Sequence, residues 1–136
     1  MGYSIIEIEG IGPTFTKKLK KAGIHTTDAL LKQAGAKKGR KAVAAETGID
    51  EAKVLKWTNM ADLMRIKGVG EEYSELLEAA GVDTVKELRN RNAANLAVAM
   101  AEANSGKKKL VRVLPGEKKV TSWVAQAKKL KPMMTY

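Results

Sequence analysis

Residues 8–32 read IEGIGPTFTKKLKKAGIHTTDALLK, and residues 66–90 read IKGVGEEYSELLEAAGVDTVKELRN. Aligned at an offset of 58, the two stretches share both glycines of a Gly–hydrophobic–Gly turn and the Ala-Gly pair some ten residues later. Self-similarity at a fixed spacing is the sign of a repeated structural unit. The repeat therefore predicts that the chain is built from two related units.

A second alignment indicates how far each unit extends. Residues 51–64 match residues 117–130 at an offset of 66, which places one tryptophan over another. The larger offset indicates an insertion, and residues 104–116 (NSGKKKLVRVLPG) have the Gly, Pro and Lys content of a long basic loop. We therefore expect a first unit over residues 1–64 and a second unit, which carries this insertion, over residues 65–136.

Helical periodicity predicts an all-α fold. Phe15, Leu19 and Ala22 recur at helical spacing, Pro13 suits the first turn of that helix, and Gly23 is placed to end it. The strand-like residues 110–114 are interpreted as an extended loop that packs Val111 or Val113 onto the helices. Further helices are predicted from about Thr26, over residues 37–47 and 50–64, and over residues 71–80, 84–91, 93–103 and 117–130. This makes about eight to ten short helices.

The connection between the two units is short. No Gly-, Ser- or Pro-rich linker separates them, because the helix predicted at residues 50–64 leads directly into the second glycine turn. We therefore expect two tandem units packed as one compact body around a shared core. Trp57 and Trp123 occupy equivalent positions and are predicted to lie in that core. Residues 132–136 are expected to fray or to make a small apolar contact.

Composition excludes several classes of chemistry. The 136 residues contain no cysteine, which excludes disulfides and thiolate sites, and one histidine, His25, which leaves little scope for histidine-based metal or triad chemistry. The carboxylates are dispersed, so we expect no enzyme activity, no metal site and no cofactor. No apolar run approaches the roughly 20 residues of a membrane span, and the first residues lack a basic signal region. These features predict a cytoplasmic protein with no membrane partner.

The first glycine turn has the features of a phosphate contact. Its glycines permit tight backbone dihedrals, and the isoleucine between them is expected to anchor the turn in the core. The bare backbone lets a phosphate approach N–H groups at a helix N-terminus, where the helix dipole is favourable, and lysines follow on the same helix. The residues predicted to contact nucleic acid here are Gly10, Ile11, Gly12, Thr14, Lys17 and Lys18.

The pattern GIGPTFTKKLKKAGIHTTDALL resembles the helix-hairpin-helix motif, especially in the N-terminal DNA-binding domain of archaeal and eukaryotic strand-exchange recombinases. Nearly the whole chain resembles an uncharacterised bacterial family, a domain of unknown function built from tandem helix-hairpin-helix elements. The resemblance implies paired hairpins in each unit and contact with nucleic-acid backbone without sequence preference. It also implies a degenerate hairpin at residues 47–50 (TGID) and hairpin carbonyls near Gly10 and Gly68 that could hold a monovalent cation.

The second glycine turn has the pattern of the first but not its charge. Glu71 and Glu72 follow it directly, and two further glutamates lie on the same predicted helix. Carboxylates in the first turns of a helix interact with the helix dipole and repel phosphate. Gly68, Val69 and Gly70 are therefore a weaker nucleic-acid candidate, and the acidic side chains favour a protein partner at this turn.

The net charge of +10 predicts a polyanionic partner. Lysines outnumber arginines, which favours point-charge contacts with phosphate over base recognition. The charge is uneven, because residues 65–91 are slightly acidic, and we expect the positive excess to gather on one face or at one end. Beyond the first turn, the candidate phosphate contacts are Lys37, Lys38 and Arg40 in the third helix and Lys107, Lys108 and Lys109 in the inserted loop.

These observations support three hypotheses. The first is a non-enzymatic module that binds the backbone of double-stranded or structured DNA without sequence preference. The second is an adaptor that docks a protein partner, or a second copy of the chain, through the acidic second turn. The third is an RNA-binding protein, which the same lysines would serve. DNA-backbone binding comes first because the glycine turn, the lysines after it and the net charge all favour phosphate.

Overall fold

The structure, a computed structural model, describes residues 2–106 and 109–136, and this part of the chain contains eight α-helices and no strand. The first unit comprises a 3₁₀ helix η1 (Ile5–Glu7) and helices α1 (Gly12–Lys21), α2 (Thr27–Ala34), α3 (Lys37–Thr47) and α4 (Glu51–Leu63). The second unit comprises α5 (Glu71–Ala79), α6 (Val85–Leu88), α7 (Ala93–Ala103) and α8 (Glu117–Lys129). The all-α prediction is confirmed. Among the described helices, none has both the length and the apolar character needed to cross a bilayer.

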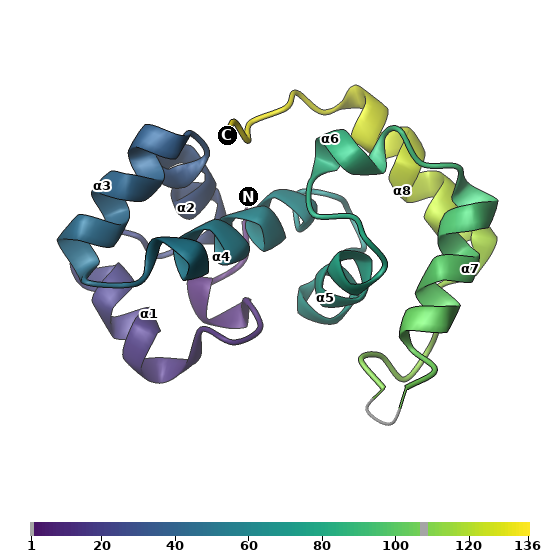
Figure 1. Cartoon of the computed structure of the whole chain (residues 1–136), viewed down its shortest axis with the longest axis horizontal. Coiled ribbons are helices and arrows are strands. Elements are labelled where there is room, and N and C mark those ends of the chain that lie inside the picture. Colours follow the sequence, from purple (N-terminus) through teal and green to yellow (C-terminus); the bar gives the residue numbers. More distant parts are fainter. Residues whose placement is uncertain (1, 107–108) are drawn as a thin grey trace.

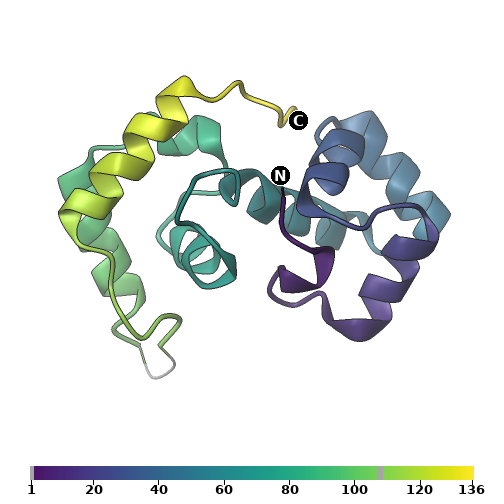
Figure 2. The ribbon, with the colours of Figure 1, turned by 180° about the vertical axis from the view of Figure 1, so that it is seen from behind.

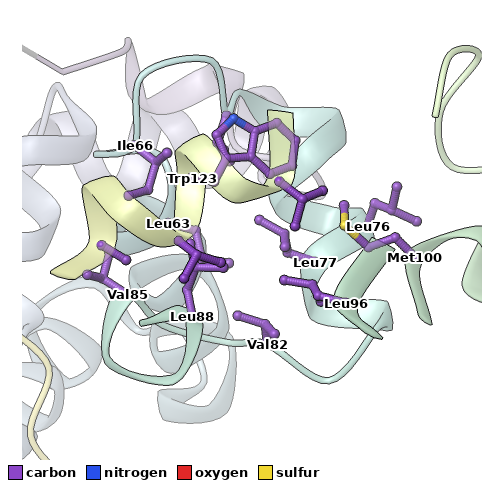
Figure 3. Close-up of a cluster of buried hydrophobic side chains, with 14 of the residues drawn as sticks. Leu63, Ile66, Leu76, Leu77, Val82, Val85, Leu88, Leu96, Met100 and Trp123 are labelled. Atoms are coloured by element: carbon purple, nitrogen blue, oxygen red, sulfur yellow. The ribbon is translucent and has the colours of Figure 1, made fainter. Parts of the chain in front are cut away.

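Buried apolar side chains form two clusters, one in each unit. The first cluster includes Ile11, Leu30 and Trp57, and the second includes Val69 and Trp123. Figure 3 shows the second cluster, in which the Trp123 indole lies among side chains from several helices of that unit. The prediction that both tryptophans are buried is confirmed, whereas the prediction of one shared core is wrong, because each unit encloses its own apolar centre.

Helix α4 joins the two clusters into one body. It packs against α2 and α3 on the side of the first unit and against α5 on the side of the second, and Figure 1 shows it between the two units. Met60 and Met64 belong to the first cluster, whereas Leu63 and Ile66 belong to the second. The C-terminal end of α4 is therefore buried on all sides, as expected for a helix that serves two cores.

A buried carboxylate strengthens this junction. Asp62 on α4 is 1% exposed, and its Oδ2 accepts a hydrogen bond of 2.9 Å from the N–H of Val85, the first residue of α6. Its Oδ1 accepts a second bond, of 2.8 Å, from Nη1 of Arg65. A carboxylate at a helix N-terminus is favourable because it meets the positive end of the helix dipole. Asp62 thus ties the second unit to the helix that it shares with the first.

The C-terminal segment after α8 returns to the first unit. In Figure 2 it runs from the end of α8 towards α2, and the C-terminal end lies close to the start of the chain. The N–H of Thr135 donates to the Gly35 carbonyl at 2.9 Å, and the Tyr136 hydroxyl donates to Oδ1 of Asn59 at 2.9 Å. Met134 is 7% exposed and makes the small apolar contact that the sequence predicts. The polar contacts of this segment were not predicted.

Candidate nucleic-acid interface

The first glycine turn exposes its backbone and buries its central side chain. Gly10 and Gly12 have φ angles of +88° and +67°, in the left-handed region that glycine adopts without steric cost. Ile11 between them is 2% exposed and belongs to the first cluster. The Ile11 N–H donates to the Ile8 carbonyl at 3.3 Å, which closes the turn. The predicted anchoring of Ile11 is confirmed, and the glycines on either side of it face solvent.

Amide groups around this turn have no partner within the described chain. Among residues 2–106 and 109–136, the N–H groups of Gly10, Gly12 and Thr14 donate no hydrogen bond. Pro13 has no N–H, and the Thr16 hydroxyl donates to the Gly12 carbonyl at 2.7 Å. The unpaired amides at the start of a helix carry the positive end of its dipole. The turn therefore presents hydrogen-bond donors to solvent where a bare backbone leaves room for an anion.

A column of side chains supports this turn. The Phe15 ring packs on Trp57 with 5.1 Å between ring centroids, and the Trp57 indole nitrogen lies close beneath Gly10. Two ammonium groups lie over Phe15, that of Lys18 at 5.7 Å and that of Lys53 at 4.9 Å from the ring centroid. Lys53 comes from the first turn of α4 and was missed by the sequence analysis, because only the packing of α4 against α1 brings it here.

These features define one surface, which we call the basic turn surface. All of its residues are exposed, and its lysines form no ion pair with any carboxylate of the described chain. The surface therefore combines free amide donors with uncompensated positive charge. It consists of Gly10, Gly12, Thr14, Lys17, Lys18 and Lys53.

A second turn of similar shape lies in the first unit, between α3 and α4. Gly48 has a φ of +73°, and Ile49 after it is buried, as Ile11 is in the first turn. A groove of about 410 Å³ separates α1 from this region, with Lys18 on one wall and Thr47 on the other. The turn expected at residues 47–50 therefore has the left-handed glycine and the buried anchor of a hairpin turn, although it carries one glycine instead of two.

The glycine turn of the second unit reproduces the supporting column. Val69 is fully buried, the Tyr73 ring packs on Trp123 with 5.2 Å between centroids, and the Lys119 ammonium lies 5.7 Å from the Tyr73 centroid. Gly68 has a φ of +97°, but Gly70 has a φ of −103°, which is extended backbone open to any residue. The two turns thus share their side-chain support and differ in backbone at the last glycine.

A glutamine occupies part of the second turn. The Lys67 N–H donates to Oε1 of Gln126 at 3.0 Å, and Nε2 of Gln126 donates back to the Lys67 carbonyl at 3.3 Å. In the repeat alignment Gln126 corresponds to Met60, which cannot make such bonds. Gln126 therefore pairs the backbone of Lys67 before the second turn, whereas the amides of Gly68, Gly70 and Glu72 have no partner within the described chain, as in the first turn.

Carboxylates gather between the two turns. Partial burial raises the pKa of Glu71 above its ordinary value of 4.5, and the nearby charge of Glu9, then of Glu72 and Glu7, raises it further. Glu7 and Glu9 belong to the first unit, so acidic side chains of both units meet at this place. They adjoin a cleft of about 290 Å³ that is also lined by Tyr3. The negative charge disfavours phosphate at the second turn.

Arg40, which the sequence places among the phosphate contacts, has a different role. Its side chain is 3% exposed. Nη1 donates to the carbonyls of Ala34 and Gly35 at 3.1 and 2.8 Å, and Nη2 donates to the Thr135 carbonyl at 2.6 Å. The guanidinium also lies 5.3 Å from the centroid of the Tyr136 ring. Its assignment to the interface is therefore wrong, because the buried Arg40 guanidinium bonds the end of α2 and the C-terminal segment.

The remaining basic candidates do not gather at one end of the molecule. Lys37 and Lys38 are exposed at the start of α3. Lys109 is exposed in the inserted loop, while the predicted contacts Lys107 and Lys108 lie outside the described residues. Figure 1 shows α1 and α3 at one end of the long axis and the loop after α7 at the other. Of the two expected arrangements, a single basic end is therefore wrong, whereas a single basic face stays a prediction.

No group of three or more His, Asp or Glu side chains within the described residues is arranged to hold a metal ion. Comparison with protein families matches residues 9–130, most of the chain, to the family described as "Domain of unknown function (DUF4332)". No curated protein and no solved structure matches the chain significantly. The resemblance to an uncharacterised domain family is confirmed, whereas the likeness to recombinase hairpins stays a prediction.

Proposed function

We propose a function for the chain as a member of the DUF4332 family, to which it belongs and whose description names no activity. The chain is a non-enzymatic module that binds nucleic-acid backbone, duplex DNA first of all, without reading the base sequence. Its contact is the basic turn surface, which acts as a helix-hairpin-helix does in the motif that its sequence resembles.

One observation carries this proposal: free amides and free ammonium groups lie on the same surface. The unpaired N–H groups of Gly10, Gly12 and Thr14 suit the oxygens of a phosphate, and Lys18 and Lys53 supply opposite charge beside them. Amides and lysines contact phosphate without regard to base identity, so this surface supports binding and not sequence recognition.

Salt dependence tests the proposal. Fluorescence anisotropy of a labelled DNA duplex, titrated with nucleic-acid-free protein at several salt concentrations, gives the slope of log affinity against log salt. We expect a steep negative slope, because bound phosphates release counterions. Lys17→Glu with Lys18→Glu should weaken binding and make that slope shallower by about 2, since each lysine–phosphate contact contributes about 1.

A matched pair of substitutions controls for net charge. Lys32→Glu with Lys86→Glu makes the same change in charge at exposed lysines outside the basic turn surface. If both double variants reduce the slope equally, binding depends on total charge and the turn is not the contact. Competition of the labelled duplex by a structured RNA of equal charge decides between DNA and RNA as the preferred partner.

The acidic cleft favours a second candidate function, an adaptor that docks a basic protein segment. Glu7, Glu71 and Glu72 line the cleft together with Tyr3, and the charge of Glu9 acts on Glu71. Opposite charge on a partner would steer it to this site. A pull-down from nuclease-treated extract that recovers one protein, and loses it when Glu71 and Glu72 become Lys, would favour this function over nucleic-acid binding.

A further inference from the structure

The second unit carries an open, positively charged groove that lies outside the basic turn surface. It encloses about 570 Å³ between the start of α7 and the outer side of α8. Arg91, Lys128 and Lys129 line it together with Thr121, and no carboxylate does. Within the described chain these three cations form no ion pair. The groove therefore holds positive charge that the protein does not neutralise.

Arg89 offsets the negative charge of the helix C-terminus that this groove adjoins. The last carbonyls of a helix carry partial negative charge, which by itself would repel an anion. Nη2 of Arg89 donates to the Lys128 carbonyl at 3.1 Å, and Nη2 of Arg65 donates to the Lys131 carbonyl at 2.8 Å. The Arg89 bond offsets the negative end of α8, whereas the Arg65 bond lies in the segment after the helix. The lysine side chains at that end are then free for an outside partner.

The first unit shows what fills the corresponding groove there. Helices α4 and α8 both have 13 residues and align over their full length. The C-terminal segment enters the groove between α3 and α4, where the Tyr136 hydroxyl bonds Asn59 and the Thr135 carbonyl accepts from Arg40. A cavity of about 370 Å³ remains beside Tyr136, compared with about 570 Å³ in the second unit, so this place in the fold is partly filled in one unit and open in the other.

The open groove has lost the groups that hold this segment. Ala125 stands where the first unit has Asn59, and the fourth residue of α7 is Leu96 where the fourth residue of α3 is Arg40. Lys128 stands where the first unit has the buried Asp62. The changes remove the acceptor and the donor that bond the C-terminal segment and add positive charge, so the groove suits an anion better than a second copy of that segment.

We propose that the groove lined by Arg91, Lys128 and Lys129 binds a phosphate group of a nucleic-acid backbone, as a second contact in addition to the basic turn surface. This inference rests on the proposed function and deepens it. The two contacts lie in different units, so a nucleic acid long enough to reach both binds more tightly than a short one, by the gain that two linked contacts provide.

Charge reversal in the groove tests this inference. Arg91→Glu with Lys128→Glu, measured by anisotropy with the labelled duplex, should make the salt slope shallower by about 2. The same variant should lose the preference of the wild type for a long duplex over a short one. Arg91 is half-buried, so Lys128→Glu with Lys129→Glu serves as a second variant in which both side chains are exposed. Thermal unfolding followed by circular dichroism verifies that each variant is folded.

The outcomes separate the two proposals. One outcome would overturn the groove and leave the proposed function standing. In that outcome the groove variants have the same salt slope as Lys32→Glu with Lys86→Glu, while Lys17→Glu with Lys18→Glu has a shallower slope. Wild-type protein that shows no salt-dependent binding would overturn both. Self-association in sedimentation experiments that disappears in the groove variants, without any change in duplex binding, would overturn the phosphate contact and assign the groove to a second copy of the chain.

Discussion

Arg40 and Lys38 stand two positions apart in one basic stretch, yet their surroundings differ. Lys38 is exposed on α3, whereas the Arg40 guanidinium donates to three backbone carbonyls. One of those carbonyls belongs to Thr135, which is 95 positions away in sequence. A local charge pattern contains no trace of such a partner, so the sequence analysis assigned both residues to the surface. The burial of Ile11 was predictable, because it is the one apolar side chain between two glycines of a tight turn.

The left-handed backbone at Gly12 gives a test at the scale of one residue. Gly12 has a φ of +67°, and no atom lies within 4 Å of the position that a Cβ would take. Gly12→Ala therefore costs only conformational strain, which we expect to lower the free energy of unfolding by about 1 kcal/mol in chemical denaturation. Gly70→Ala, at the aligned position with a φ of −103°, places alanine in a backbone region that any residue adopts, so this variant should lose less stability than Gly12→Ala. Equal losses would contradict the assigned backbone.

The raised pKa of Glu71 predicts a dependence of stability on pH. The folded protein holds the Glu71 proton more tightly than the unfolded chain does, so the resulting stabilisation is complete below the unfolded pKa and is lost as pH rises through the folded pKa. Glu71→Gln removes this loss of stability at higher pH, because glutamine carries no charge at any pH. Denaturation at about pH 4 and about pH 7 should show the variant gaining stability over the wild type at the higher pH. Glu102→Gln, on the exposed side of α7, is the control. The prediction would be contradicted if the difference in unfolding free energy between Glu71→Gln and the wild type were the same at both pH values.

At the scale of elements, periodicity and turn residues predicted the positions of most helices. The third helix was predicted at residues 37–47 and is α3 (Lys37–Thr47), and the first was predicted to end before Gly23, as α1 (Gly12–Lys21) does. The helix expected at residues 84–91 is shorter, because α6 (Val85–Leu88) ends where its last residues turn towards α7. The Thr84 hydroxyl caps this helix by accepting a hydrogen bond from the Glu87 N–H at 3.3 Å.

What the repeat could not reveal is which elements touch. Lys53 and Phe15 lie on different helices, and their contact exists only because α4 packs near α1. Their partners in the alignment, Lys119 and Tyr73, meet in the same way. A repeat seen in sequence therefore showed equivalent positions in the two units, and the structure was needed to show that these positions form a column. The same reasoning explains why the open groove of the second unit was not anticipated.

These two lysines give a matched test of the basic turn surface. Lys53→Glu should weaken duplex binding and make the salt slope shallower by about 1, because the Lys53 ammonium over Phe15 is one of the cations of the basic turn surface. Lys119→Glu removes the equivalent cation from the Tyr73 ring of the second unit, where carboxylates surround the turn. It should leave the slope close to that of the wild type. Anisotropy titrations decide, and a larger effect of Lys119→Glu would reverse the assignment of the two turns.

At the scale of the molecule, two cores and one shared helix replace the single core that the sequence suggested. The absence of a flexible linker was interpreted correctly as a sign of one body. The expectation of one shared core was wrong, because the two units keep separate apolar clusters. Helix α4 and the C-terminal segment connect them. Short linkers indicate proximity, whereas the sharing of a core depends on which faces are apolar after folding.

Removal of Arg40 tests the connection through the C-terminal segment. A hydrogen bond from a charged donor contributes about 1.5–3 kcal/mol, so Arg40→Ala should loosen residues 133–136 and speed hydrogen exchange of the Thr135 amide, which bonds to Gly35, by about tenfold. Lys38→Ala, an exposed neighbour on the same helix, should leave that rate unchanged. Unaltered exchange in Arg40→Ala would show that the segment is held without the guanidinium.

The return of the C-terminal segment has a mechanical consequence. Two units joined by a single helix can rotate about the axis of that helix, whereas a second contact away from the axis resists this rotation. Here α4 is the shared helix, and the contacts of Thr135 and Tyr136 with the first unit are the second connection. The orientation of the units therefore depends on this segment as well as on α4. Force applied between the two units in single-molecule stretching should produce two rupture events. The contacts of the C-terminal segment should break first and α4 should unfold second.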